Sequence, residues 1–152
     1  MQSQPHMMIV LMAEDDADDR LMVEEAWHEV QSPHGLRFVE NGEELLDYLY
    51  HRGAYVDSQN SPRPSLILID LNMPKVNGWQ ALKFIKTDPE LKQIPVVVVS
   101  TSGEYDDVVQ AYDLGVNGYI TKSLTFDGVV QTMKALNDYW LSITTLPSQN
   151  QR

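Results

Sequence analysis

The 152-residue chain contains 11 basic and 22 acidic residues, which gives a formal net charge of −11, and it has no cysteine. This charge argues against nucleic-acid binding, because phosphate backbones bind clustered Lys and Arg side chains, and it favours a protein partner. The lack of cysteine excludes disulfides and thiolate metal sites, so we expect a cytoplasmic protein, and no segment approaches the roughly 18 consecutive apolar residues of a membrane span.

Short apolar runs alternate with segments of helical spacing along the chain. Strands are predicted at Met8–Ala13, Leu36–Glu40, Leu66–Ile69, Val96–Val99 and Gly118–Thr121. The spacing of Val23, Ala26, Trp27 and Val30 and of Ala81, Leu82 and Ile85 indicates helices after the first and third strands, and further helices are predicted at Gly42–Tyr50, Glu104–Leu114 and from Thr125 to about Thr144. The alternation predicts a single α/β domain over residues 1–152, with a doubly wound parallel sheet, five helices, a core at about 7–144 and short tails.

Local signals mark several boundaries of these elements. Asp16 is expected at the start of the first helix, where the helix dipole favours a negative charge. The run Thr101–Glu104 has the pattern of a capping box before the fourth helix, and Gly115 stands where that helix should end. Residues Gly53–Pro64 lack a sustained period and are rich in turn formers, which predicts a long surface loop.

Four predicted strands end in residues with chemical function: Glu14-Asp15 after the first, Asp70 after the third, Ser100 after the fourth and Lys122 after the fifth. The carboxyl ends of parallel strands meet at one edge of an open sheet, so these side chains should share a crevice, where ligands usually bind. We expect Asp70 to face solvent there. A lone aspartate after a strand is more often a turn or helix-cap residue, so the interpretation depends on the combination.

The residue types in this crevice indicate phosphoryl chemistry. Carboxylates that converge without a basic partner repel one another, and Mg²⁺ would stabilise them, because it takes one or two carboxylates and keeps waters for a phosphoryl group. Asp70 is then a candidate nucleophile of the kind that forms aspartyl-phosphates. In this reading Ser100 hydrogen-bonds a phosphoryl oxygen, and Lys122 contacts only the phosphoryl group.

These residues resemble the receiver domains of two-component response regulators, and the resemblance covers nearly the whole chain. The run Met73-Pro74-Lys75-Val76-Asn77-Gly78 is similar to the turn that follows the phosphoacceptor strand in that family. The resemblance implies a flavodoxin-like sheet with strand order 2-1-3-4-5. It also implies a role for each site residue: Glu14 and Asp15 as the metal-binding pair, Asp70 as phosphoacceptor and metal ligand, Asn72 as a metal ligand through its backbone carbonyl, Ser100 as switch hydroxyl, Tyr119 as switch aromatic and Lys122 as the phosphate-pairing lysine.

The chain departs from the common family pattern at two positions. Ser123 follows Lys122 in place of a proline whose preceding bond is usually cis, and a cis bond before another residue costs about 2.5–4 kcal/mol, so this loop should be trans or strained. Glu14 replaces the first aspartate, which should preserve metal binding. The loop ending Ser61–Pro64, the Lys122-Ser123 pair and the tail from Tyr139 to Pro147 resemble single-domain regulators that serve phytochrome-type kinases. This implies a sensor histidine kinase as partner, with light as a possible input.

Three functions follow from these residues. The first is a phosphorylation switch, in which a phosphoryl group on Asp70 draws Ser100 inward, Tyr119 follows, and the face of the fourth helix, fifth strand and fifth helix changes shape. The second is a phosphohydrolase that uses the same aspartate; such enzymes usually have a second aspartate two residues later, where this chain has Asn72. The third is a vestigial receiver that acts only as an interaction module, against which the intact carboxylates, Ser100 and Lys122 argue.

The fifth helix predicts self-association. We expect one inward stripe, and further apolar residues continue beyond it at the helix end. We therefore predict a homodimer through the fourth helix, fifth strand and fifth helix; the alternative is that Trp140 folds back onto its own domain. The stripe consists of Phe126, Val129, Val130, Met133 and Leu136, and the continuation of Tyr139, Trp140 and Ile143.

Overall fold

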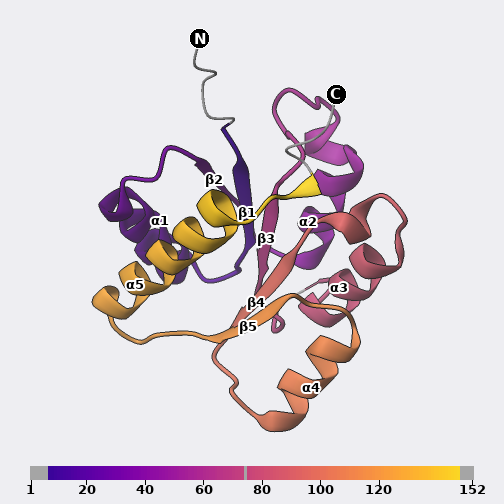
Figure 1. The fold of residues 1–152 in the computed structure, drawn as a ribbon. Helices are drawn as coiled ribbons and strands as arrows, with labels where there is room; N and C mark the ends of the chain where they lie inside the picture. The colour runs from indigo at the N-terminus through magenta and orange to yellow at the C-terminus, as the bar shows by residue number, and fades with distance from the viewer. Residues whose placement is uncertain (1–6, 74, 148–152) are drawn as a thin grey trace.

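A computed structural model describes residues 7–73 and 75–147, so the predicted N-terminal tail at 1–6, Pro74 and residues 148–152 of the predicted C-terminal tail lie outside the described residues. Five parallel strands form one sheet in the order β2-β1-β3-β4-β5, which confirms the predicted fold class (Figure 1). The strands are β1 (Ile9–Ala13), β2 (Gly35–Val39), β3 (Leu66–Ile69), β4 (Val96–Ser100) and β5 (Gly118–Thr121). The helices are α1 (Ala17–Val30), α2 (Gly42–Tyr50), α3 (Gly78–Thr87), α4 (Tyr105–Asp113) and α5 (Phe126–Leu136).

The helices cover both faces of the sheet. Helices α1 and α5 lie side by side on one face, and α2 and α3 lie together on the other (Figure 1). Alternate residues of β1 point to opposite faces: Leu11 and Ala13 join the core under α2 and α3, whereas Val10 and Met12 join the core under α1 and α5. Every residue of β1, β3 and β4 is buried, as continuous apolar runs predict for the centre of a parallel sheet.

The start of α4 does not form the predicted capping box. Glu104 is the N-cap residue, and its side chain makes no capping hydrogen bond. Instead, the Ser102 hydroxyl donates to Asp107 Oδ2 at 2.6 Å and accepts weakly from the Glu104 backbone N–H at 3.3 Å. Ser102, two residues before the N-cap, is therefore hydrogen-bonded to the first turn of α4. The predicted end of α4 holds, because Gly115 follows it with a φ of 105°.

The predicted fifth helix is not regular to Thr144. It ends at Leu136 and continues as a π-helix at Asn137–Ile143. The wider π turn brings Leu141, five residues after Leu136, onto the core, and Leu146 packs into the same core cluster. Trp140 is half-buried against this cluster, while Tyr139 and Ile143 remain exposed.

Two other sequence expectations need correction. In the predicted inward stripe of α5, Val129, Met133 and Leu136 are buried and Val130 is half-buried, but Phe126, the first residue of the helix, is 39% exposed. The Gly53–Pro64 segment is also not wholly superficial. It contains a 3₁₀ turn at Gly53–Tyr55, and Ser61 is fully buried with its hydroxyl near the carbonyl oxygens of Tyr55 and Asp57.

None of the helices built from the described residues combines the length and the apolar character needed to cross a bilayer.

Candidate functional site

The strand ends bring the chemically active side chains to one edge of the sheet. Backbone hydrogen bonds continue the sheet past the last strand residues: the Asp70 N–H donates to Ala13, and the Lys122 N–H donates to Ser100. Glu14 is held in the same way, by its N–H on the Val39 carbonyl at 3.0 Å. The parallel ladder therefore places Glu14, Asp70 and Lys122 together, although they are far apart in the sequence.

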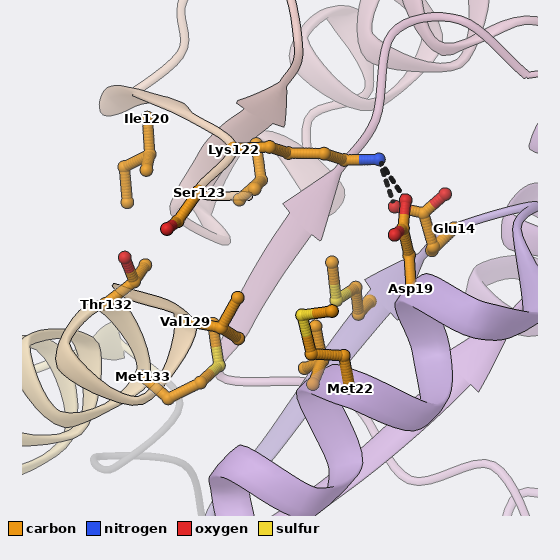
Figure 2. A pocket seen from close by; sticks show the side chains of 12 residues that line it. Glu14, Asp19, Met22, Ile120, Lys122, Ser123, Val129, Thr132 and Met133 are labelled. Atoms are coloured by element: carbon orange, nitrogen blue, oxygen red, sulfur yellow. Dashed lines mark hydrogen bonds and ion pairs between the residues drawn. The ribbon is translucent and has the colours of Figure 1, made fainter. Parts of the chain in front are cut away.

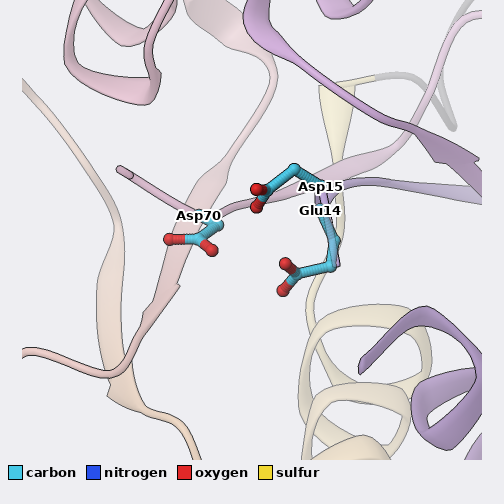
Figure 3. Close-up of side chains that lie close together, drawn as sticks. All are labelled: Glu14, Asp15 and Asp70. Atoms are coloured by element: carbon cyan, nitrogen blue, oxygen red, sulfur yellow. The ribbon is translucent and has the colours of Figure 1, made fainter. Parts of the chain in front are cut away.

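Three carboxylates converge at this edge. Glu14, Asp15 and Asp70 each offer an oxygen, and these oxygens all lie within 4.8 Å of one another (Figure 3). Glu14 is fully buried and Asp15 is exposed. Asp70 is only 6% exposed, so the expectation that it faces solvent is wrong; the loop after β3 and the neighbouring side chains enclose it. A set of clustered oxygen donors carrying up to three negative charges fits a hard divalent cation.

Lys122 reaches into the same cluster. Its Nζ atom lies 2.6 Å from Glu14 Oε1 and 3.1 Å from both Asp19 Oδ2 and Asp70 Oδ2. Figure 2 shows the lysine extending from the end of β5 toward Glu14 and Asp19. Two expectations are therefore wrong: the carboxylates do have a basic partner, and Lys122 has contacts with protein carboxylates of its own. The sequence did not reveal this, because the ammonium and Asp19 are 103 residues apart.

Burial and charge oppose each other at this ion-pair cluster. Burial raises the pKa of Glu14 from 4.5 to about 7, and the nearby Lys122 ammonium limits the rise. Burial alone would lower the pKa of Lys122, but its contact with Glu14 and the charges of Asp70 and Asp19 outweigh this and raise that pKa above its ordinary value. These contacts therefore favour the charged form of Lys122, and its positive charge in turn favours the ionised form of Glu14.

The start of α1 positions Asp19. Asp16 is the N-cap residue, as expected, and its Oδ1 accepts hydrogen bonds from the backbone N–H groups of Asp18 at 2.8 Å and Asp19 at 3.0 Å. Asp19 thus stands in the first helical turn with its carboxylate on Lys122. We did not identify Asp19 from the sequence. The local signal that could have indicated Asp19 is its position three residues after the N-cap Asp16, which itself follows the acidic pair Glu14-Asp15.

Ser100 and Tyr119 are both hydrogen-bonded to Ser102, in the segment that joins β4 to α4. Ser100 is fully buried, and its Oγ accepts from the Ser102 backbone N–H at 3.2 Å. The Tyr119 hydroxyl donates to the Ser102 carbonyl at 2.6 Å, and its ring packs on the core under α2 and α3. The segment between β4 and α4 is therefore tied to both the site serine and β5.

The loop after Asp70 is packed against the start of α3. The Asn72 N–H donates to Asp70 Oδ1 at 3.1 Å, and the Gly78 N–H donates to the Leu71 carbonyl at 3.0 Å. A Cβ atom at Gly78 would lie 2.3 Å from the Asp70 carbonyl oxygen, so only glycine fits there. A role for the Asn72 carbonyl in metal binding stays a prediction. The Lys122–Ser123 peptide bond is trans, one of the two possibilities that the sequence left open.

A small apolar cavity of about 40 Å³ lies behind the ion pairs, between α1 and α5 (Figure 2). Lys122, Glu14 and Asp19 form one end of it. The methionine side chains of Met12, Met22 and Met133 line much of the remainder. The ion pairs therefore border a largely apolar surface on this side, where a lower local dielectric constant strengthens them relative to fully exposed pairs.

Comparison with known proteins identifies relatives over almost the entire chain. The family model of the response regulator receiver domain matches residues 10–134. The response regulator Rcp1 of Synechocystis sp. is 40% identical over 147 residues, which are 97% of each chain.

Solved structures agree with the sequence comparison. The phosphorylated cyanobacterial phytochrome response regulator RcpA superimposes with a TM-score of 0.86 at 43% identity, covering 93% of this chain and 99% of that one. The Mn²⁺-bound form of Rcp1 superimposes with a TM-score of 0.82 at 39% identity, covering 92% and 99%. These similarities span nearly the full length of each relative.

Proposed function

The chain belongs to the family of response regulator receiver domains, and from this premise we propose that it accepts a phosphoryl group on Asp70 from a sensor histidine kinase. The observation that carries the proposal is the position of the Asp70 carboxylate. It lies 3.1 Å from the Lys122 ammonium and beside the carboxylates of Glu14 and Asp15. Such a site can hold a phosphoryl group between the attacking Asp70 carboxylate and two cations, the Lys122 ammonium and a metal ion on the carboxylate cluster.

In the proposed transfer, a carboxylate oxygen of Asp70 attacks the phosphorus of a phosphohistidine. A P–O bond forms, the P–N bond breaks, and the imidazole leaves with the bonding electrons and takes up a proton. Lys122 can direct its N–H groups to the phosphoryl oxygens, and Ser100 can donate its hydroxyl to one of them. A bound divalent cation, for which we propose Mg²⁺, would neutralise charge on the phosphoryl oxygens.

The carboxylates fit that cation by chemistry and spacing. Glu14, Asp15 and Asp70 are the residues that would hold it, with the Asn72 carbonyl as a further proposed ligand. The Mn²⁺-bound form of the relative Rcp1 supports a divalent cation in this family. The one-methylene difference between glutamate and aspartate at position 14 leaves its oxygen within the cluster.

The proposed output is a change of the surface formed by α4, β5 and α5. Movement of the Ser100 hydroxyl toward a phosphoryl group would remove its bond with the Ser102 N–H, and Ser102 is the residue that holds the Tyr119 hydroxyl. We therefore propose that Ser100 and Tyr119 act as the switch pair. The protein would act as a signalling switch rather than a turnover enzyme, since Asn72 replaces the general acid that aspartate-nucleophile hydrolases use.

The proposed partner is a phytochrome-type histidine kinase. The names of RcpA and Rcp1 support this, because the first is described as a phytochrome response regulator and both match this chain over nearly their full length. Phosphotransfer profiling against candidate histidine kinases tests the proposal. Rapid transfer from a phytochrome-type kinase, faster than from unrelated kinases, is the expected result.

The phosphorylation site can be tested with acetyl phosphate and Mg²⁺. Wild type should form one covalent phosphoryl adduct, measured by mass, and Asp70→Asn should form none while retaining its fold. Asp57→Asn, at an exposed loop position, is the matched control and should be phosphorylated normally. Steady release of phosphate without adduct would favour the phosphohydrolase, and no reaction would favour a vestigial receiver.

We also propose a homodimer through α4, β5 and α5. Several large apolar side chains on these elements are exposed, and an apolar groove of about 470 Å³ lies along α5. Trp140 is half-buried on its own domain, which makes Tyr112 on α4, 50% exposed, the better probe. Sedimentation of wild type and Tyr112→Glu, with and without phosphorylation, should show a dimer only for wild type. A monomer in every state would end this proposal.

A further inference from the structure

Two sets of charged contacts overlap at the site. Lys122 pairs with Glu14, Asp19 and Asp70, and the carboxylates suited to a divalent cation are Glu14, Asp15 and Asp70. Glu14 and Asp70 belong to both sets. Asp15 belongs only to the metal set, and Asp19 belongs only to the lysine set.

The overlap creates a conflict between the two cations. A divalent cation on Glu14 and Asp70 would share these two carboxylates with the Lys122 ammonium and would also repel it. Lys122 is only 13% exposed, so its charge cannot turn freely into solvent. Of its three carboxylate partners, Asp19 is the one outside the metal set.

We propose that Asp19 is a positioning residue that retains the Lys122 ammonium at the site when a divalent cation occupies Glu14 and Asp70. This inference rests on the proposed function, because it takes the metal site as given. Asp19 is well placed for the role, because the Asp16 cap fixes its backbone and its carboxylate lies 3.1 Å from the Lys122 Nζ atom. Lys122 would then stay close to the phosphoacceptor oxygen in both states.

The proposal predicts a thermodynamic coupling. Without metal, Lys122 in an Asp19→Asn variant still has Glu14 and Asp70 as partners. With metal bound, both of these carboxylates are shared between Lys122 and the cation. The substitution therefore destabilises the metal-bound state more than the metal-free state and weakens metal binding. Because Asp19 is partly exposed, the expected loss of affinity is about threefold.

The experiment measures Mn²⁺ affinity of the full chain by electron paramagnetic resonance of the free ion. Asp18→Asn is the matched control, since it removes the same charge from the adjacent, exposed residue of the same helical turn. Asp19→Asn should bind Mn²⁺ about threefold more weakly than Asp18→Asn. Both substitutions are then repeated in a Lys122→Met background, where the difference between them should disappear.

Equal affinities of Asp19→Asn and Asp18→Asn in the presence of Lys122 would overturn the proposal. An undiminished difference after Lys122→Met would also overturn it, because Asp19 would then act on the cation directly. Thermal unfolding checks each variant, and Lys122→Gln replaces Lys122→Met if the latter does not fold. Asp15→Asn separates this inference from the metal site itself: if it binds Mn²⁺ as wild type does, the proposed metal site fails and Asp19 has no such role.

Discussion

Replacing Gly78 with alanine tests how closely α3 must approach the loop that carries Asp70. A Cβ atom at this position would lie 2.3 Å from the Asp70 carbonyl oxygen and 2.4 Å from Leu71 Cα. Normal carbon contacts are about 3.5–4.0 Å, so the start of α3 would have to move by roughly 1 Å. Both neighbours are backbone atoms, and no side-chain rotation can relieve the overlap.

Two effects of Gly78→Ala lower the free energy of unfolding, and one effect raises it. Overpacking costs about 1–3 kcal/mol, and weakening the Gly78 N–H bond to the Leu71 carbonyl costs about 0.5–1.5 kcal/mol. The better helix propensity of alanine returns up to about 1 kcal/mol. The expected net loss of unfolding free energy is about 2–3 kcal/mol, which lowers Tm by about 4–12 °C for a domain of this size.

Thermal unfolding followed by circular dichroism measures this change, and Mn²⁺ affinity reports on the site in the same samples. Metal binding should weaken, because the displaced backbone carries Asp70. Gly118→Ala is the control, since its Cβ would make only an ordinary contact with Val97 at 3.5 Å. If Gly78→Ala unfolds at the same temperature as wild type, or above Gly118→Ala, the steric reasoning is refuted.

Further predictions concern the site, the switch and the end of α5. Chelation with EDTA should stop phosphorylation by acetyl phosphate; equal incorporation, measured by mass, would show that the acidic cluster has another role. Tyr119→Phe should reduce the unfolding free energy by about 0.5–1.5 kcal/mol in urea titration, because it removes the hydrogen bond to the Ser102 carbonyl, while the adduct on Asp70 still forms. Leu141→Ala should cost about 2–5 kcal/mol through a buried cavity, whereas exposed Ile143→Ala should stay within about 0.5 kcal/mol; similar values for both would place Leu141 outside the core.

The sequence alone was sufficient for the sheet and for most of the residues at its edge. Strands that are buried on both faces need continuous apolar runs, and such runs are visible without any tertiary information, as at Leu66–Ile69. A parallel sheet then brings the strand ends together, so the proximity of Glu14, Asp15, Asp70 and Lys122 followed from topology.

Only the tertiary structure decided which of these groups pair and how deeply they are buried. The contact of Lys122 with Asp19 joins residues 103 positions apart and depends on the approach of α1 to the end of β5, which no local pattern encodes. The low exposure of Asp70 and the inward position of Leu141 in the π-helix also depend on packing between elements that are distant in sequence. Hydrophobic periodicity and cap signals report on neighbours along the chain, whereas side-chain pairing and burial are set by packing between elements that are distant in sequence.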